Sequence, residues 1–267
     1  MSPQPATSPL LSVRVAGVAR LTLNQPERFN PLSAAMISAL QSELDVIGRD
    51  SLVRVIVLAA EGKGFCAGHD LREMRAHADD ASWQRRLFDD CSRMMMTLTR
   101  VPQPVIAQVQ GIATAAGCQL VAMCDLAVAA DTATFATPGV NIGVFCSTPA
   151  VGVARNVGRK RAMEMLLTGK PIDAETAAAW GLVNRVVPVD QLDSAVSEFT
   201  DIIVARSAEV NRLGKQAFYR QIDGSLEVAY DVASETMARN MMLGDAAEGI
   251  AAFLEKRPPK WRSSHRG

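Results

Sequence analysis

The sequence lacks a net charge and lacks any long apolar run. Lysine plus arginine and aspartate plus glutamate both number 28 in its 267 residues. This balance argues against a protein that binds nucleic acid through a basic surface. No apolar run approaches the roughly 20 residues that cross a bilayer, so no membrane span is expected. Residues 1–9 are rich in proline and serine but lack the features of a signal peptide, and we predict a disordered tail there.

Motifs for metal ions, disulfides and phosphate loops are also missing. The cysteines are odd in number and lie in apolar surroundings: Cys66, Cys91, Cys118, Cys124 and Cys146. Reduced thiols in a cytoplasmic protein fit this pattern best. The cysteines form no fourfold set with zinc-like spacing, so no metal is expected. Gly62-Lys63-Gly64 matches neither phosphate-loop pattern, because the lysine precedes the second glycine.

The sequence does contain an ordered succession of strands and helices. With 48% hydrophobic residues it can bury a full core, most simply as one domain with an extension. Apolar runs predict strands at 11–15, 18–23, 53–59, 105–109 and 126–130. Helices are predicted after Ser33 and at 81–98, 149–157, 159–167, 174–180, 190–206, 208–222 and 225–243, and a last one from Asp245, where Asp245-Ala-Ala-Glu248 resembles a capping box. Helices alone follow the alternating part, so we predict an α/β core with a helical C-terminal extension.

One motif of strand, small-residue turn and helix start occurs twice. It occupies residues 104–125 and returns in residues 61–71, where Ala67-Gly-His-Asp-Leu71 echoes Ala116-Gly-Cys-Gln-Leu120. A helix that starts after such a turn has unpaired N–H groups, which suit an anion or a developing oxyanion. Alternatively, the small residues serve only to let the helix pack close to a sheet. Two such donor sites are what an oxyanion hole requires.

Five segments, in this order, resemble the crotonase (enoyl-CoA hydratase/isomerase) superfamily over roughly residues 10–262. They are residues 24–30, 64–71, 104–111, 116–125 and 251–257. Residues 135–149 are most similar to the branch named enoyl-CoA hydratase domain-containing protein 3. The resemblance implies a crotonase-like spiral of ββα repeats over residues 10–200. It also implies a helical oligomerisation region over residues 201–267 that forms a homotrimer or a dimer of trimers.

The resemblance further implies an acyl-CoA thioester as ligand, with coenzyme A as part of the substrate and no separate cofactor. The thioester carbonyl would lie between the backbone N–H groups of His69 and Ala116, which would stabilise an enolate oxygen. The imidazole of His69 either points into the pocket or is packed or solvated. Carried over by position, the substrate-binding residues are Arg28, Asn30, Ala67, Asp70, Leu71, Ile112, Ala115, Pro138, Asn141, Phe253 and Lys256. Phe253 and Lys256 would reach the CoA of a neighbouring subunit, and Arg28 is either a phosphate ligand or a solvated loop residue.

Two positions depart from the family pattern. Hydratases of the family carry two glutamates that position a water and shuttle its proton, and here the positions hold Gln119 and Gly139. Glutamine can hold a water but cannot take its proton, and glycine has no side chain. Because each such group is worth roughly 10²–10⁴ in rate, most hydratase activity should be lost. Asp70 is the nearest carboxylate but also suits the N-cap of a helix over 71–76, and Cys146 has no evident base beside it.

Three hypotheses remain open from the sequence. The first is an enzyme of fatty-acyl-CoA metabolism, a weak hydratase, isomerase or thioester-cleaving enzyme that relies on the oxyanion hole. The second is a protein that binds acyl-CoA without catalysis. The third is a subunit whose oligomeric surface serves the assembly of partners.

Overall fold

The computed structural model of the chain describes residues 8–262. Residues 1–7, which make up most of the predicted tail, lie outside the described residues. The last two residues of that predicted tail form hydrogen bonds with β1 and with the residue that follows β2. Ser8 Oγ donates to the Leu10 carbonyl at 2.7 Å, and the Asn24 amide donates to the Pro9 carbonyl at 2.7 Å.

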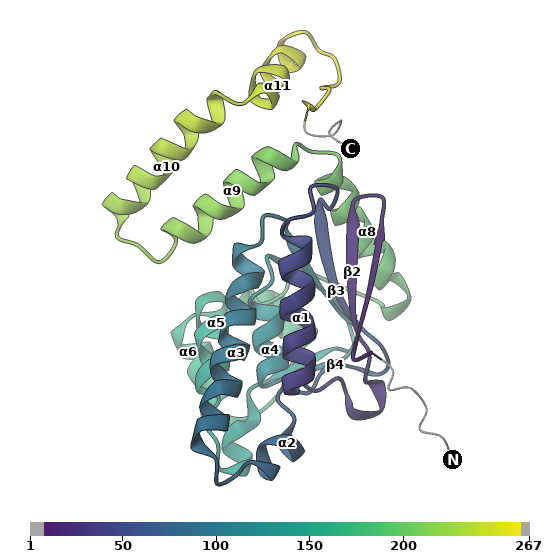
Figure 1. The fold of residues 1–267 in the computed structure, drawn as a ribbon, viewed down its shortest axis with the longest axis vertical. Coiled ribbons are helices and arrows are strands. Elements are labelled where there is room, and N and C mark those ends of the chain that lie inside the picture. Colours follow the sequence, from purple (N-terminus) through teal and green to yellow (C-terminus); the bar gives the residue numbers. More distant parts are fainter. Residues whose placement is uncertain (1–7, 263–267) are drawn as a thin grey trace.

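Two sheets are built by a repeated ββα unit (Figure 1). The larger sheet has the order β1-β2-β3-β5-β7-β10 and the smaller the order β4-β6-β8-β9. The strands are β1 Leu10–Val15, β2 Val18–Leu23, β3 Val55–Ala60, β4 Gly64–Cys66, β5 Val105–Val109, β6 Ile112–Thr114, β7 Leu126–Ala130, β8 Thr134–Ala136, β9 Ile172–Asp173 and β10 Arg185–Val187. In each of the pairs β3–β4, β5–β6 and β7–β8, the first strand joins the larger sheet and the second the smaller. The predicted α/β class is confirmed.

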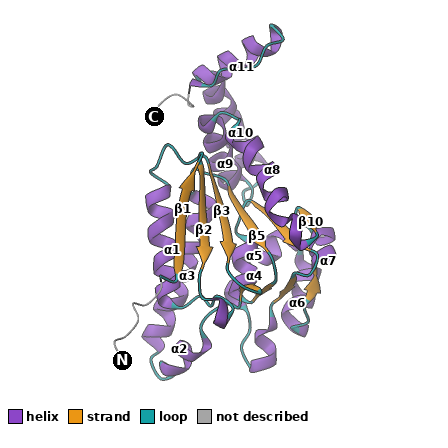
Figure 2. Cartoon of the chain, turned by 90° about the vertical axis from the view of Figure 1, so that its right-hand side faces the viewer, coloured by secondary structure: helices purple, strands orange, loops and turns teal. Residues whose placement is uncertain are grey.

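Helices cover both faces of the larger sheet (Figure 2). They are α1 Ala34–Ile47, α2 Leu71–Ala76, α3 Ala81–Arg100, α4 Ala116–Ala122, α5 Ser147–Val157, α6 Arg159–Thr168, α7 Ala174–Trp180, α8 Leu192–Val204, α9 Ala208–Gln221, α10 Leu226–Met241 and α11 Gly244–Leu254, with 3₁₀ turns η1 Pro26–Arg28, η2 Pro138–Ile142 and η3 Val189–Gln191. Alternate side chains of β3 point to opposite faces of the sheet and pack in different hydrophobic clusters. Ile56 and Leu58 join the main core with α1 and α3, whereas Val55 and Val57 pack with α8. A strand buried on both faces explains the unbroken apolar run in the sequence.

Predicted helix caps are confirmed where the cap is local. Ser33 accepts from the Met36 amide at 3.2 Å, and Asp173 accepts from the Thr176 amide at 2.8 Å. The predicted capping box at Asp245 is wrong, because α11 begins at Gly244 and Leu243 occupies the N-cap. The buried carboxylate of Asp245 instead accepts from Ser207 Oγ at 2.6 Å and from the Arg262 amide at 2.6 Å. Donors from distant parts of the chain therefore replace the local ones.

The C-terminal helices α9, α10 and α11 extend away from the sheets (Figure 1). Many apolar side chains of this extension are exposed in the single chain: Phe218, Ile222, Leu226, Val228, Met237, Met241, Phe253 and Leu254. Within the described part of the chain, no helix has both the length and the hydrophobicity needed to traverse a membrane.

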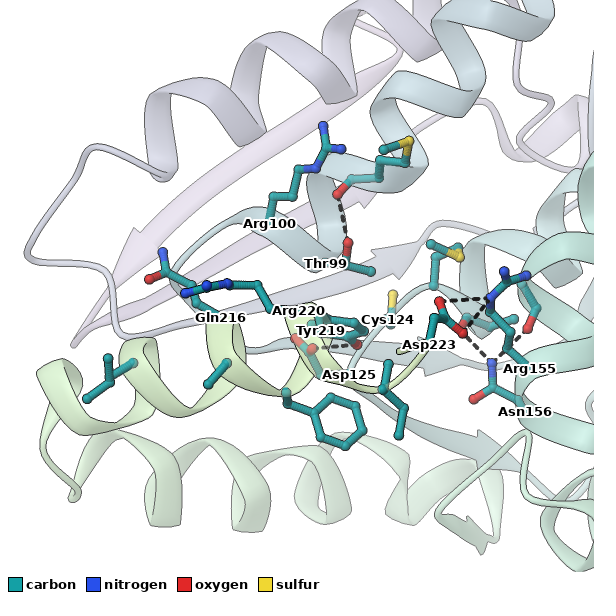
Figure 3. A pocket seen from close by; sticks show the side chains of 18 of the residues that line it. Thr99, Arg100, Cys124, Asp125, Arg155, Asn156, Gln216, Tyr219, Arg220 and Asp223 are labelled. Atoms are coloured by element: carbon teal, nitrogen blue, oxygen red, sulfur yellow. Dashed lines mark hydrogen bonds and ion pairs between the residues drawn. The ribbon is translucent and has the colours of Figure 1, made fainter. Parts of the chain in front are cut away.

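A buried ion pair attaches α9 to the core. Lys215 Nζ donates to Asp125 at 2.6 Å and to the carbonyls of Leu98 and Gln103, each at 2.8 Å. Tyr219 donates to the other oxygen of Asp125 at 2.9 Å (Figure 3). Burial lowers the pKa of Lys215, while the negative charge of Asp125 opposes that shift. A cavity of about 1140 Å³ lies beside this contact, between the α9–α10 hairpin and helices α3, α4 and α5.

Lys215→Met should destabilise the fold strongly, because it leaves the Asp125 carboxylate buried without its cation. Removing one partner of a buried ion pair costs about 3–5 kcal/mol. Unfolding by urea measures the change. The matched control is Lys160→Met on α6, where the lysine is exposed and the expected change lies within about 0.5 kcal/mol. Equal midpoints for the two variants would contradict the assigned role of the ion pair.

Candidate active site

Two glycines bring the repeated motifs into contact. A Cβ atom on Gly117 would lie 2.1 Å from the Cys66 carbonyl oxygen, so the start of α4 packs directly on the end of β4. Gly68 has a φ of +83°, and a Cβ there would lie 3.1 Å from the backbone nitrogen of Ala116. The small residues therefore save space, as the alternative interpretation proposed. The same packing places the backbone before α2 beside the first amide of α4.

Some amides around this contact have acceptors. The Ala67 amide donates to the Phe29 carbonyl at 2.8 Å, and the Ala115 amide donates to the Ala136 carbonyl at 2.9 Å. Among the described residues, no group accepts a hydrogen bond from the amide of His69 or of Ala116. Ala116 is the first residue of α4, so its N–H has no acceptor within the helix. The amides of Gly117 and Cys118 likewise have no acceptor among the described residues, so those of His69 and Ala116 are two of several free backbone donors where the motifs meet.

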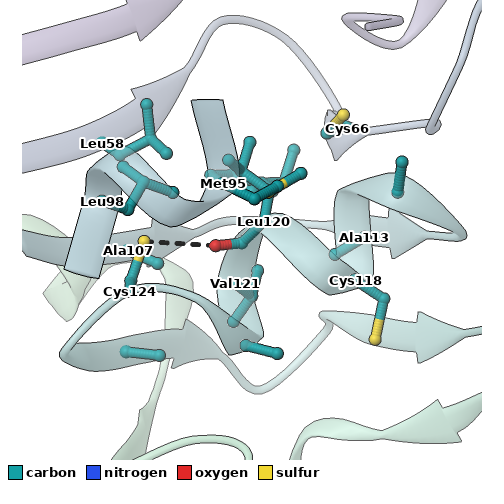
Figure 4. Packing of buried hydrophobic residues seen from close by; sticks show 14 of the residues in the cluster. Leu58, Cys66, Met95, Leu98, Ala107, Ala113, Cys118, Leu120, Val121 and Cys124 are labelled. Carbon is teal, nitrogen blue, oxygen red and sulfur yellow. Dashed lines mark hydrogen bonds between the residues drawn. The ribbon is translucent and has the colours of Figure 1, made fainter. Parts of the chain in front are cut away.

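The turn that presents these donors is strained. Ala115 precedes α4 with φ 51° and ψ −118°, a conformation that residues with a Cβ rarely adopt. Helix α4 itself is buried along its whole length. Its residues Leu120 and Val121 pack among Met95 and Leu98 of α3, as Figure 4 shows. The core therefore holds the helix start rigidly in place.

The imidazole of His69 is packed, as one of the two sequence interpretations held. Its ring lies edge-to-face on Phe88, with 5.2 Å between centroids, and its Nε2 atom is buried without a partner. Burial lowers the pKa of His69 to about 4. The ring is therefore neutral near pH 7 and is a weak base.

Gln119 lies on α4, one turn beyond the free Ala116 amide. The side chain is only 4% exposed, and its amide oxygen is buried without a hydrogen-bond partner. Because an unpaired buried acceptor is costly, it favours a donor such as a water or a bound ligand at this place.

The space at Gly139 is filled by its own loop. A Cβ there would lie 2.3 Å from the Val144 carbonyl oxygen and 2.9 Å from Cys146 Sγ. The Gly139 amide donates to that sulfur at 3.3 Å. Burial raises the pKa of the Cys146 thiol, which disfavours the thiolate. Burial also raises the pKa values of the Cys66 and Cys118 thiols to about 12. All five cysteines are free and buried.

Asp70 acts as the N-cap of α2, as predicted. It accepts from the Arg72 amide at 3.0 Å and forms an ion pair with Arg28. Burial alone would raise the pKa of Asp70, but hydrogen bonds from Arg28 and from the amides of Arg72 and Glu73 hold it below its usual value. A carboxylate held in this way is a poor base. Arg28 therefore lies against α2 and is neither free nor fully solvated.

Several other predicted residues have structural partners. Asn30 is fully buried, donates to the carbonyls of Glu61 and Gly64 and accepts from the Gln25 amide, so its amide is used within the loop. Asn141 lies against Gly169, and Pro138 starts η2. Sequence reasoning missed Thr137, whose buried hydroxyl oxygen has no partner, and no motif marks it.

Apolar and distant residues complete the predicted set. Leu71 and Ile112 are exposed beside the two motifs, and Val144 and Phe145 are exposed on the loop that packs on Gly139. Phe253 belongs to α11. In space, this helix lies at the opposite end of the molecule from α2 (Figure 1). Phe253 and the exposed Lys256 are therefore not brought to His69 within one chain. Among residues 8–262, no three His, Cys, Asp or Glu side chains come close enough together to hold a metal ion.

Comparison with known proteins gives consistent matches over nearly the whole chain. A family model described as enoyl-CoA hydratase/isomerase matches residues 14–264. The chain is 46% identical over 245 residues to rat enoyl-CoA hydratase domain-containing protein 3, mitochondrial, covering 92% of this chain and 81% of the rat protein. It is 33% identical over 256 residues to the probable enoyl-CoA hydratase of Mycobacterium bovis, covering 94% of this chain and 97% of that protein.

Solved structures agree with the fold. An enoyl-CoA hydratase of Mycobacterium smegmatis is 53% identical with a TM-score of 0.93, covering 95% of this chain and 98% of that one. Human enoyl-CoA hydratase domain-containing protein 3 is 44% identical with a TM-score of 0.92, and the match covers 95% of this chain and 100% of the human one. The crotonase-like fold and the similarity to the domain-containing protein 3 branch are confirmed.

The expected cytoplasmic location is contradicted. The rat, mouse, frog, human and zebrafish relatives are all named mitochondrial. Reduced thiols indicate a reducing compartment but do not say which one, so the cysteine pattern could not decide this.

Gly139→Ala should destabilise the protein, because its new methyl group would meet the Val144 carbonyl and the Cys146 sulfur. Overpacking of this kind costs about 1–3 kcal/mol. The matched control is Gly214→Ala in α9, where nothing lies within 4 Å and the helix should gain up to about 1 kcal/mol. Urea unfolding of both variants measures the difference. A stabilised Gly139→Ala variant would show that the loop does not fill this space.

His69→Gln should flatten the acid limb of the stability curve. The folded-state pKa of about 4 lies below the ordinary 6.5, so the unfolded chain binds the proton first and stability falls as the pH drops between those values. Each pH unit contributes about 1.4 kcal/mol, up to about 3 kcal/mol in all. Denaturation of wild type and variant at several pH values measures this difference. Parallel curves from pH 6.5 to 4 would mean that His69 is not buried as a neutral ring.

Proposed function

Because the chain belongs to the enoyl-CoA hydratase/isomerase family, we propose that it binds an acyl-CoA thioester in fatty-acyl-CoA metabolism and polarises its carbonyl. The carbonyl oxygen lies between the backbone N–H groups of His69 and Ala116. The observation that carries this proposal is the group of unbonded amides where the two motifs meet, which includes those of His69 and Ala116. Coenzyme A enters as part of the substrate, and no separate cofactor is needed.

The two amides suit the chemistry of a thioester enolate. Negative charge develops on one oxygen, and fixed donors aimed at that oxygen stabilise it without reorganising. The strained turn at Ala115 and the buried helix α4 support this rigidity. Each such donor is worth roughly 10²–10³ in rate.

Proton transfer is the weak part of this site. Gln119 has an unpaired buried oxygen that suits a water, but its amide cannot accept that water's proton. The pKa of His69, about 4, and the lowered pKa of Asp70 make both groups poor bases near pH 7. The site therefore favours a slow hydratase, an isomerase or a thioester-cleaving enzyme in which carbonyl polarisation does most of the work.

Exposed apolar side chains offer a surface for the acyl chain. Leu71 and Ile112 flank the amides in the chain, and Val144 and Phe145 lie on the loop that packs on Gly139. Apolar groups exposed together beside a polar site commonly mark a binding surface.

The C-terminal extension supports an oligomer. Many apolar residues of α9, α10 and α11 are exposed in the single chain. Neighbouring copies in a homotrimer or a dimer of trimers bury them at the subunit interface. In that assembly Phe253 and Lys256 of one subunit reach the coenzyme A held by another.

A second candidate is a protein that binds acyl-CoA without turning it over. The observation in its favour is the loop at Gly139, which closes the space that a catalytic carboxylate would need. Binding would then persist while turnover is absent.

Ala116→Pro should lower thioester turnover by roughly 10²–10³, because proline removes the N–H of Ala116, the first residue of α4. Turnover of a panel of acyl-CoAs, including crotonyl-CoA, measures the effect. The control is Ala81→Pro, which makes the same change at the exposed first residue of α3. Far-UV circular dichroism checks that both variants fold. Unchanged turnover in a folded Ala116→Pro variant would refute the role of this amide.

Calorimetry with the same acyl-CoAs separates the two candidates. Tight binding without turnover favours the binding protein, and no affinity for any acyl-CoA eliminates both.

Gln119→Glu then tests the missing base: a large rise in crotonyl-CoA hydration identifies a hydratase site that lacks only this group.

A further inference from the structure

A second cavity lies at the end of the larger sheet where β3 and β5 begin, away from the candidate active site. Its volume is about 660 Å³. Its walls include Arg54 just before β3 and Gln103 just before β5, and α9 and the start of α11 close it. The candidate active site follows the opposite ends of these strands, near α2 (Figure 1). The cavity and the candidate active site are therefore separated by the length of these strands.

Two buried polar groups in this cavity lack partners. Gln103 is 5% exposed, and its Nε2 donates to the carbonyls of Ile47 at 2.8 Å and Asp50 at 3.2 Å. These bonds fix the side chain, but its Oε1 is buried without a hydrogen bond. The Nε–H of Arg54 is also buried and unpaired, while the Nη2 of the same residue donates to the Arg206 carbonyl. The residues that line the cavity thus include one unused acceptor and one unused donor.

The charges that line the cavity favour an anion. Four arginines contribute to its walls: Arg49, Arg54, Arg212 and Arg262. Neither Arg49 nor Arg262 forms an ion pair with any side chain that the structure describes. Three carboxylates also line the cavity, those of Asp50, Glu209 and Asp245.

Each of the three carboxylates has its own partner. Asp50 pairs with Arg14 at 3.5 Å, and Glu209 pairs with Arg212 at 3.9 Å. The remaining one, Asp245, accepts from Ser207 and from the Arg262 amide. Burial lowers the pKa of Arg54, and the negative charge of Asp245 opposes that shift. Four arginines against three carboxylates leave the walls with a net positive charge.

We propose that this cavity binds a small oxyanion that also carries a hydroxyl group. An anionic oxygen accepts from Arg54 Nε, and the hydroxyl donates to Gln103 Oε1. Guanidinium groups suit phosphate and carboxylate oxygens. Hydrogen phosphate and a small hydroxycarboxylate share this chemistry, and the volume admits either. This site is distinct from the acyl-CoA site and does not depend on the proposed function.

Matched pairs of anions test the proposal on the unmodified full chain. At about pH 7, inorganic phosphate retains a hydroxyl and sulfate has none, and lactate differs from propionate in the same way. Calorimetry at constant ionic strength measures all four affinities. We expect the hydroxylated member of at least one pair to bind about tenfold more tightly, because its partner leaves Gln103 Oε1 unpaired. The preferred pair identifies the source of the oxyanion.

Arg54→Met tests the donor, and Arg86→Met on the exposed face of α3 is the control. The first variant should weaken binding of the preferred anion about tenfold or more, and the second should leave it unchanged. Equal affinities within both pairs, no binding of any of the four anions, or equal binding by Arg54→Met and wild type would each overturn the proposal. Since the anion pairs are compared on the wild-type protein, the proposal can fail even if the variant does not fold.

Discussion

The close approach of Gly117 to the Cys66 carbonyl is the contact on which the rest of the candidate site depends. A single Cβ at this place would lie 2.1 Å from that oxygen, so only glycine lets α4 begin directly on β4. The approach leaves the first amide of α4 next to the backbone before α2. The two repeats of one motif thereby come into contact, and the buried core holds them together.

The surroundings of the His69 and Ala116 amides are unusually free of usable bases. His69 is packed on Phe88 and neutral, Asp70 is held as a carboxylate by Arg28, and the nearby thiols are buried. At Gly139 the Val144 carbonyl and the Cys146 sulfur occupy the space of a side chain. These surroundings suit the carbonyl polarisation proposed above better than they suit proton transfer. The family similarity therefore supports acyl-CoA binding more strongly than it supports hydration.

The C-terminal extension follows a different physical principle. One buried ion pair, Lys215 with Asp125, joins α9 to the core, and the apolar faces of α10 and α11 remain exposed in the single chain. The second cavity lies where this extension meets the starts of β3 and β5, and it has an unpaired amide oxygen of its own, on Gln103.

The sequence by itself determined the local structure and the family. Apolar runs located β5 and β7, and Ser33 and Asp173 marked their helix starts, because strand burial and capping depend on residues close in the chain. The tertiary structure alone decided the roles of Asn30, Asp245 and Gly139. Asn30 resembled a binding residue and Asp245 resembled a cap, yet each takes partners from distant segments. Local patterns carry no information on such contacts, because they form only when the repeats pack together.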